Sequence, residues 1–156
     1  YIRKGTHGVA DMNSFQKRYL KGVTFPEGLK YIGSEAFERT DLKSVKLPRT
    51  VELMKYSAFR GTKIKEITLP ASMKRVDKWV FMDCEQLDRI TVEGKDTQII
   101  WPAVTGHHNG TPMIIESPLN SHAQAYCEKY GKKYNLVFEE KKPVVKNNIF
   151  TLRRKK

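Results

Sequence analysis

Cysteine is scarce in this chain, and long apolar runs are missing. Two cysteines stand among 156 residues, too few for the disulfide framework of a cystine-rich secreted domain. The longest apolar run, Trp79 to Met82, has four residues, whereas a membrane-spanning helix needs about 20. With 39% hydrophobic and 29% charged residues, the composition is that of an ordinary folded protein with one core. We therefore expect one domain without a membrane span.

Familiar catalytic motifs are also missing. The sequence has no nucleophile elbow, no glycine-rich phosphate-binding loop and no H-E-x-x-H pair. Its acidic residues recur in no repeating column, so no carboxylate pair for hydrolysis stands out. An enzyme with a cleft beside Trp101, His107 and His108 stays formally open. We nevertheless predict that the chain is not an enzyme and has no catalytic residue.

Metal ligands are sparse as well. The adjacent His107 and His108 cannot point to one face of a strand, while His7 and His122 are remote in sequence. Both cysteines are predicted to be buried packing residues rather than reactive thiols. No metal site and no cofactor are therefore expected.

Acidic residues are few relative to basic ones. Asp and Glu number 17 against 29 Lys and Arg, which gives a net charge of +12. The segment 139–156 holds seven basic and two acidic residues, so the segment 1–138 holds the remaining 22 and 15, or +7. The excess is therefore shared between the body of the chain and its end. Such a charge favours an acidic partner, unless it serves only to keep the protein soluble.

What the sequence does contain is an internal repeat, L-x-x-V-x-L-P, whose first position recurs at 20, 42, 64 and 87, in steps of 22, 22 and 23. Its copies are Leu20, Val23, Phe25, Pro26; Leu42, Val45, Leu47, Pro48; Ile64, Ile67, Leu69, Pro70; and Leu87, Ile90, Val92, Glu93. Further columns keep the same step, namely Phe15, Phe37, Phe59, Phe81 and Thr40, Thr62, Cys84. Columns in register over four copies indicate a solenoid in which each repeat is one coil.

Each part of the repeat has a physical interpretation. In V-x-L, alternate residues point inward, so we expect one short strand per coil. Proline ends that strand because it cannot donate to a ladder and has a fixed φ. A turn and a short irregular segment then return with Ile, Ala and Phe inward. Since no coil buries its apolar face by itself, neighbours must stack, and Phe37, Phe59 and Phe81 are predicted to form a buried aromatic ladder.

The ends of the array are expected to differ from its middle. We expect one solenoid domain over 1–138. It is predicted to consist of a degenerate first coil at 1–22, core repeats at 23–92, an atypical coil at 93–115, and a capping helix and strand at 116–138. A basic C-terminal extension at 139–156 follows, with enough apolar residues for a short strand. Asn120 or Ser121 is expected to cap the helix, with Gly131 just past its end.

Two further strands are predicted from the spacing of apolar pairs. Met113 and Ile115 follow Ile90 and Val92 by one more step of the repeat, which predicts a strand in that register. Leu136 and Phe138 follow after another equal step and predict the final strand.

The motif L-x-x-V-x-L-P, followed by a spaced A-F and a small residue three positions later, resembles the BspA-like leucine-rich repeat family. The resemblance covers about residues 12 to 92, and the segment 117–138 is similar to the helix-then-strand unit that often ends such arrays. It implies a leucine-rich-repeat solenoid of the α+β repeat type, in which the length of a coil equals the step of the motif. It also implies adhesion or recognition on surface and secreted proteins of host-associated bacteria, hence an extracellular or cell-surface location. No catalytic residue comes with it.

Two columns of the repeat place polar residues on the outside of the strands. The first column, directly after the motif Leu or Ile, is Lys21, Lys43 and Lys65. The second, within the strands, is Thr24, Lys46, Thr68 and Thr91, with Arg89 nearby. A stacked lysine column repels itself unless its side chains splay into water or meet an anionic partner. These eight residues are the candidate partner-binding site, and the other interpretation is a solvated rim that keeps the protein soluble.

Two functions agree with this pattern. The first is a non-enzymatic binding or adhesion module that recognises a protein or an acidic glycan, of a host or of extracellular matrix, through its strand face. The second is a basic nucleic-acid or polyanion binder that uses the lysine column and the basic C-terminal extension. Nucleic acid is the less favoured partner, because no nucleic-acid-binding fold is recognised and the aromatic ladder is predicted to be buried. A structural role within a longer repeat array stays open as well.

Overall fold

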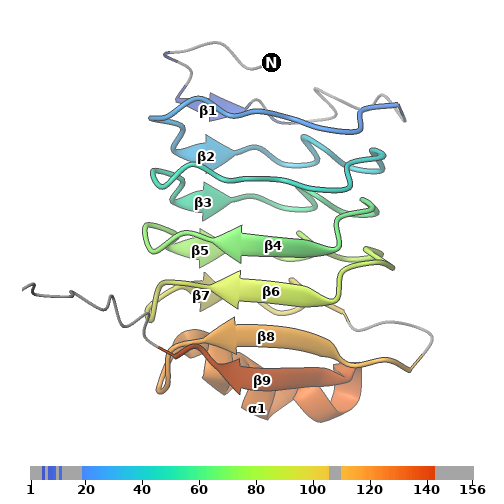
Figure 1. Ribbon diagram of the computed structural model, residues 1–156, viewed down its shortest axis with the longest axis vertical. Helices are drawn as coiled ribbons and strands as arrows, with labels where there is room; N and C mark the ends of the chain where they lie inside the picture. Colours follow the sequence, from blue (N-terminus) through green and yellow to red (C-terminus); the bar gives the residue numbers. More distant parts are fainter. Residues whose placement is uncertain (1–4, 6, 10, 12–18, 106–109, 143–156) are drawn as a thin grey trace, which may run out of the picture.

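The computed structural model describes residues 5, 7–9, 11, 19–105 and 110–142. In this part of the chain, two parallel sheets and the helix α1 (His122–Tyr134) enclose one core. About five turns of chain stack along the long axis, and α1 closes one end (Figure 1). This arrangement confirms the predicted solenoid with a cap made of a helix and a strand.

Each sheet collects one segment from successive coils. The front sheet has the order β4-β6-β8-β9 and consists of β4 (Glu66–Leu69), β6 (Arg89–Val92), β8 (Met113–Ser117) and β9 (Leu136–Glu140). The back sheet has the order β1-β2-β3-β5-β7 and consists of β1 (Gly8–Val9), β2 (Tyr31–Ile32), β3 (Leu53–Met54), β5 (Arg75–Val76) and β7 (Gln98–Ile99). The front sheet is formed by the V-x-L segments, whose alternate residues face the core as predicted: Ile67 and Leu69 are buried on β4.

The back sheet adds a second strand to each coil, where an irregular return segment was expected. Its strands have two residues, of which the second is buried, as at Ile32, Met54 and Val76. Partners along the sheet stand one repeat apart, for example Ile32 with Met54. A single inward residue per strand is too short a pattern to show period-two alternation, so the sequence could not reveal these strands.

The aromatic ladder is confirmed. Phe37, Phe59 and Phe81 are at most 1% exposed, with ring centroids 5.2 Å and 6.1 Å apart and planes within 10° of parallel. Phe25 meets Phe37 edge-on at 5.7 Å. Phe15, expected at the start of this column, lies outside the described residues. The ladder joins the coils through the middle of the core.

Residues of the column Thr40, Thr62 and Cys84, beside the aromatic ladder, donate hydrogen bonds to backbone carbonyl groups. The Thr40 hydroxyl donates to the Phe37 carbonyl at 2.9 Å, and in a later coil the Cys84 thiol donates to the Phe59 carbonyl at 3.2 Å. Cys84 is buried, and this burial raises the pKa of its thiol. Burial likewise raises the pKa of Cys127 to about 12. Both thiols therefore stay protonated and serve as packing residues, as predicted.

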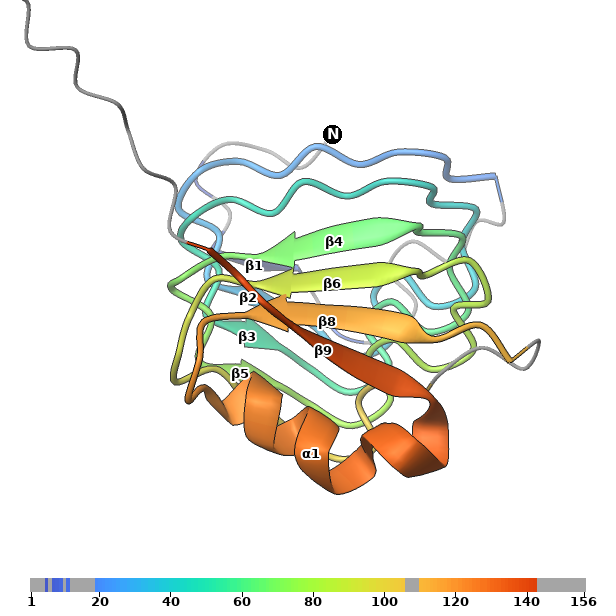
Figure 2. The ribbon, with the colours of Figure 1, turned by 60° about the horizontal axis from the view of Figure 1, so that its bottom comes forward.

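The C-terminal cap follows the prediction at its beginning but not at its end. The Ser121 hydroxyl caps α1 by accepting from the backbone N–H of Gln124 at 3.1 Å. Gly131, expected just past the helix, lies inside it, and the left-handed cap residue is Asn135 with φ 52°. A Cβ at Gly131 would sit 2.7 Å from the Leu136 carbonyl oxygen. This glycine therefore serves the close approach of α1 to β9, the two elements that close this end of the solenoid (Figure 2).

The register of β8 differs from the prediction by two positions. Ile90 pairs with Ile115 rather than with Met113. The next step is the predicted one, since Met113 pairs with Leu136. A slip of two positions leaves the same side chains facing the core, so the apolar pattern fits both registers equally well.

β9 continues to Glu140, so the domain boundary predicted at 138 falls within this strand. Residues 143–156, which make up most of the basic C-terminal extension, lie outside the described residues. The division into a solenoid and a separate extension stays a prediction.

Candidate functional site

The strand face comprises the outward side chains of the front sheet and of the two coil segments 23–25 and 45–47 beside it. Thr68 and Thr91 point outward from β4 and β6, where they pair directly. Thr24 and Lys46 stand in the same column but are joined only by an isolated parallel bridge. The predicted column of four outward residues is therefore present, though it crosses a gap in the ladder between Lys46 and Thr68.

In the C-terminal half of the strand face, the positive charge is already balanced. The Arg89 guanidinium lies 2.7 Å from a carboxylate oxygen of Glu139 and 3.4 Å from one of Glu116. The hydrogen bond to Glu139 raises the pKa of Arg89. The Thr91 hydroxyl donates to Glu116 at 3.2 Å. Arg89 and Thr91, two of the candidate residues, are thus half-buried and engaged with acids of the same face.

Sequence reasoning missed these two acids because of the register of β8. In the predicted register, Glu116 would stand beside Glu93 and away from Arg89. In the observed register, Thr91 pairs with Glu116, and Glu116 pairs with Glu139 on β9. The two-position slip therefore brings both carboxylates onto the column of Thr91.

In the N-terminal half of the strand face, the candidate side chains are exposed. They are Lys21, Thr24, Lys43, Lys46, Lys65 and Thr68. Within the described part of the chain, none of its four lysines has an ion-pair partner. Some lysines elsewhere do, as with Lys63 and Asp41 at 2.6 Å or Lys30 and Glu52 at 2.7 Å. This half of the face therefore carries a group of four exposed lysines whose charge no ion pair within the described residues neutralises.

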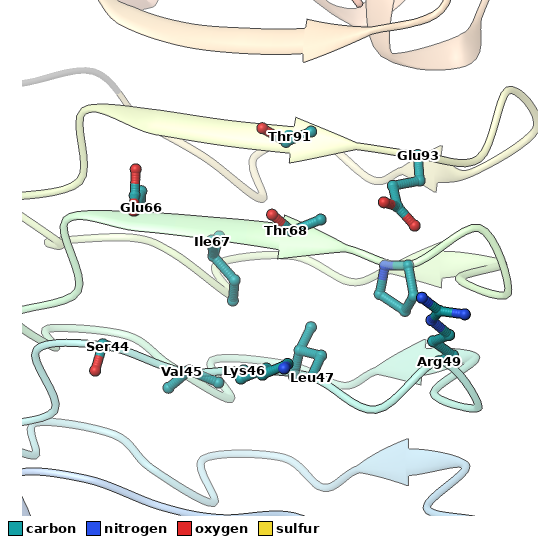
Figure 3. Close-up of a pocket in the computed structure, with 11 residues that line it drawn as sticks. Ser44, Val45, Lys46, Leu47, Arg49, Glu66, Ile67, Thr68, Thr91 and Glu93 are labelled. Carbon is teal, nitrogen blue, oxygen red and sulfur yellow. The ribbon is translucent and has the colours of Figure 1, made fainter. Parts of the chain in front are cut away.

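A cleft opens on the strand face where the ladder is interrupted. It has a volume of about 450 Å³ and lies between the segment 44–47 and β4 (Figure 3). The residues around it are Ser44, Val45, Lys46, Leu47, Arg49, Glu66, Ile67, Thr68, Pro70, Thr91 and Glu93. Apolar Val45, Leu47 and Ile67 form its floor, whereas charged and hydroxyl side chains surround the opening. We call this feature the strand-face cleft.

Trp101, an aromatic residue at the surface, takes part in packing. Trp101 stacks on Tyr130 of α1 with ring centroids 5.6 Å apart and meets Tyr134 at 6.3 Å. His107 and His108 lie outside the described residues, so a cleft formed with Trp101 is not defined. Trp101 is therefore a contact between the last coils and the cap.

Among the described residues, no group of three or more His, Cys, Asp or Glu side chains is placed to hold a metal ion. Of the helices described, none has the length and apolar character needed to cross a bilayer.

Comparison with known families decides the relationship. Residues 10–129 match the family model described as "BspA type Leucine rich repeat region", in six copies. The chain belongs to this family. No curated protein and no solved structure gives a significant match to it.

Members of the BspA-type leucine-rich repeat family are associated with surface proteins, and their repeats typically act as non-enzymatic scaffolds for interactions with other proteins. The match covers the coils that carry the ladder, the strand-face cleft and the unpaired lysines. The comparison thus assigns this domain to a class of interaction modules, and the choice of surface is a separate question.

Proposed function

We propose that this domain is a non-enzymatic binding module of a surface or secreted protein, which recognises a macromolecular partner through its strand face. The observation that supports this proposal is the group of unpaired lysines on the N-terminal half of that face. Stacked coils place like charges close together, and such an arrangement is stabilised by an anionic partner. Solenoids offer extended surfaces of this kind.

The partner is proposed to be an acidic protein or an acidic glycan, such as those of host surfaces and extracellular matrix. Charge complementarity supports this choice, because Lys21, Lys43, Lys46 and Lys65 are exposed along one line of coils. Exposed cations give long-range attraction and raise the rate of association with an anionic surface.

A nucleic-acid partner has less support. Proteins that bind single-stranded nucleic acid combine positive charge with aromatic side chains on which bases stack. The phenylalanines of the ladder are buried, and the column of Thr68 on the strand face consists of Thr24, Lys46, Thr68, Thr91, Glu116 and Glu139. Positive charge is therefore the only feature that the strand face shares with such proteins.

Retention on immobilised heparin and on immobilised DNA across a salt gradient tests the proposal. The triple variant Lys43→Ser, Lys46→Ser, Lys65→Ser should elute from heparin at clearly lower salt than the wild type. Its matched control is Lys30→Ser, Lys63→Ser, Lys74→Ser, which removes the same charge from lysines that are paired with acids. Equal elution of the two triple variants would show that only net charge matters and would reject the strand face as a site.

A further inference from the structure

The strand-face cleft exposes backbone groups of β4. The carbonyl groups of Lys65 and Leu69 accept hydrogen bonds from Asp88 and Glu93 of the next coil, at 2.8 Å and 3.0 Å. Alternate residues of a parallel strand bond to opposite neighbours, so the N–H and C=O of Thr68 point toward the segment 44–47. Among the described residues, no backbone hydrogen bond joins that segment to β4. Thr68 therefore presents a donor and an acceptor inside the cleft.

The same two coils are firmly joined on the other side of the solenoid. There β3 pairs with β5, Leu53 opposite Arg75 and Met54 opposite Val76. The coils are thus closed at the back sheet and separated at the front, which gives the cleft the form of a wedge. Its floor is more accessible than the core below the closed ladder: Val45 and Leu47 are 9% and 8% exposed, against 1% and 0% for Ile90 and Val92.

Both cationic and acidic side chains surround the opening of the strand-face cleft. Lys46 and Arg49 are exposed and, within the described residues, have no ion-pair partner. Glu93 lies at the Arg49 end of the cleft (Figure 3), and its carboxylate is 3.4 Å from the Lys141 ammonium group. Glu66 lies at the opposite end of the cleft from Arg49 (Figure 3). An anionic group near Lys46 and Arg49 would therefore meet two cations that form no ion pair within the described residues.

We propose that the strand-face cleft binds an acidic side chain of an extended peptide. The carboxylate accepts hydrogen bonds from the Lys46 ammonium group, the Arg49 guanidinium and the backbone N–H of Thr68. Its aliphatic carbons, and those of a neighbouring residue, pack on Val45, Leu47 and Ile67. The cleft volume of about 450 Å³ lies within the ~300–1,000 Å³ common for ligand sites, enough for two or three side chains.

A peptide fits this cleft better than a glycan does. The aliphatic floor suits the methylene groups and the branched ends of amino-acid side chains, and a peptide N–H can donate to the Thr68 carbonyl while the carboxylate accepts from its N–H. This inference rests on the proposed function, because it specifies which part of the strand face the partner contacts.

The probe is the blocked pentapeptide acetyl-Gly-Leu-Glu-Leu-Gly-amide, and its control has Gln in place of Glu. Titration into the full ¹⁵N-labelled chain, followed by amide chemical shifts, should move the signals of Lys46, Arg49 and Thr68 most. The Gln peptide should bind at least tenfold more weakly. Shifts spread over the surface without a maximum at the cleft, or equal responses to the two peptides, would overturn the proposal.

Two variants separate the cleft from the surrounding charge. Lys46→Thr introduces the residue that stands at positions 24, 68 and 91 of the same column, and it should weaken binding of the Glu peptide at least tenfold. Lys78→Thr removes the same charge from an exposed lysine that is neither part of the cleft lining nor of the strand face, and it should change the affinity less than twofold. Equal losses in both variants would overturn the proposal, and unchanged melting temperatures would confirm that both fold.

A heparin disaccharide serves as the third probe. If it moves the cleft signals and the Glu peptide does not, the occupant is a glycan and the peptide proposal fails. If the peptide fails while the lysine triple variant still loses heparin retention, the strand face remains a binding surface and only the cleft is rejected. If the peptide binds at the cleft while both triple variants elute alike, the cleft stands and the wider lysine surface is rejected.

Discussion

The two halves of the strand face start from the same motif and reach different states. From β4 to β9 the strands form a continuous ladder, and Arg89 is neutralised by Glu116 and Glu139. Over the segments 23–25 and 45–47, the ladder shrinks to the bridge between Thr24 and Lys46, and the lysines are unpaired within the described residues. The difference teaches that an apolar repeat specifies the core, whereas the ladder and the charge pattern above it vary from coil to coil.

The rest of each coil explains why the open half still holds together. Besides the back sheet, backbone hydrogen bonds connect successive coils, for example from Phe37 N–H to the Ala58 carbonyl at 2.9 Å and from Phe59 N–H to the Val80 carbonyl at 3.1 Å. Together with the aromatic ladder, these bonds join neighbouring coils where the front sheet is interrupted. The coils of the N-terminal half are therefore joined although their front segments share little backbone hydrogen bonding.

The largest effect on stability is expected from a mutation in the aromatic ladder, which runs beneath both halves of the strand face. Phe59 stacks on Phe37 and Phe81 and is fully buried, so Phe59→Ala should lower the free energy of unfolding by about 3–5 kcal/mol. Chemical denaturation measures this change. The control Tyr19→Ala alters a side chain that is 86% exposed and should be nearly neutral. A loss below about 1 kcal/mol for Phe59→Ala would contradict the joint role of the ladder.

At the C-terminal end of the front sheet, the position of β9 depends on its contact with α1. Gly131→Ala places a Cβ 2.7 Å from the Leu136 carbonyl oxygen, so it should destabilise the protein by about 1–3 kcal/mol. Helix propensity by itself predicts the opposite sign, a gain of about 1 kcal/mol. The melting temperature distinguishes the two, with Lys132→Ala on the exposed side of the helix as control. A stabilised Gly131→Ala variant would refute the tight contact.

The charge contrast between the halves can be removed by mutation. Glu116→Gln with Glu139→Gln frees Arg89, so the C-terminal half should become basic and the protein should elute from heparin at higher salt. Stability should fall by less than about 1 kcal/mol, because the ion pairs are near the surface. The control Glu85→Gln with Glu128→Gln has the same net charge. If both double variants elute together, the local balance of charge at Arg89 has no effect on the face.

The smallest effect is expected in the pH dependence of stability, through Glu52 on the back of the solenoid. Hydrogen bonds from Lys30 and Lys74 lower the pKa of Glu52 to about 2 from its ordinary 4.5. Because the folded pKa is the lower one, the stability that Glu52 contributes is complete above pH 4.5 and is lost as the pH falls through about 2. Melting temperatures between pH 5 and pH 2 should therefore fall slightly more for the wild type than for Glu52→Gln. Parallel curves would contradict the shift.

The core could be predicted from particular residues. Ile67, Leu69 and Phe59 each belong to a column that recurs once in every coil, and each is buried. Gly131 could not be placed correctly, because a glycine near the end of a helix indicates a C-cap as readily as a close contact with another element. Only the position of β9 against α1 distinguishes these two roles.

The candidate site was accessible to sequence reasoning only in part. The exposure of Lys43, Lys46 and Lys65 follows from alternation within and before the strands. The strand-face cleft does not follow, because 45–47 and 67–69 carry the same V-x-L pattern and still lack a common ladder. Hydrogen bonds between two coils form only where their backbones lie close enough together. The apolar pattern within one coil does not determine that distance.

The sequence by itself determined the solenoid, the inward residues and the location of the capping helix, since a repeated periodicity records which side chains must leave water. The tertiary structure decided which coils pair and which charges meet. It placed Ile115 rather than Met113 beside Ile90 and so brought Glu116 to Thr91 and Arg89. The physical reason is that burial is unchanged by a slip of two positions, whereas every contact between outward side chains changes with it.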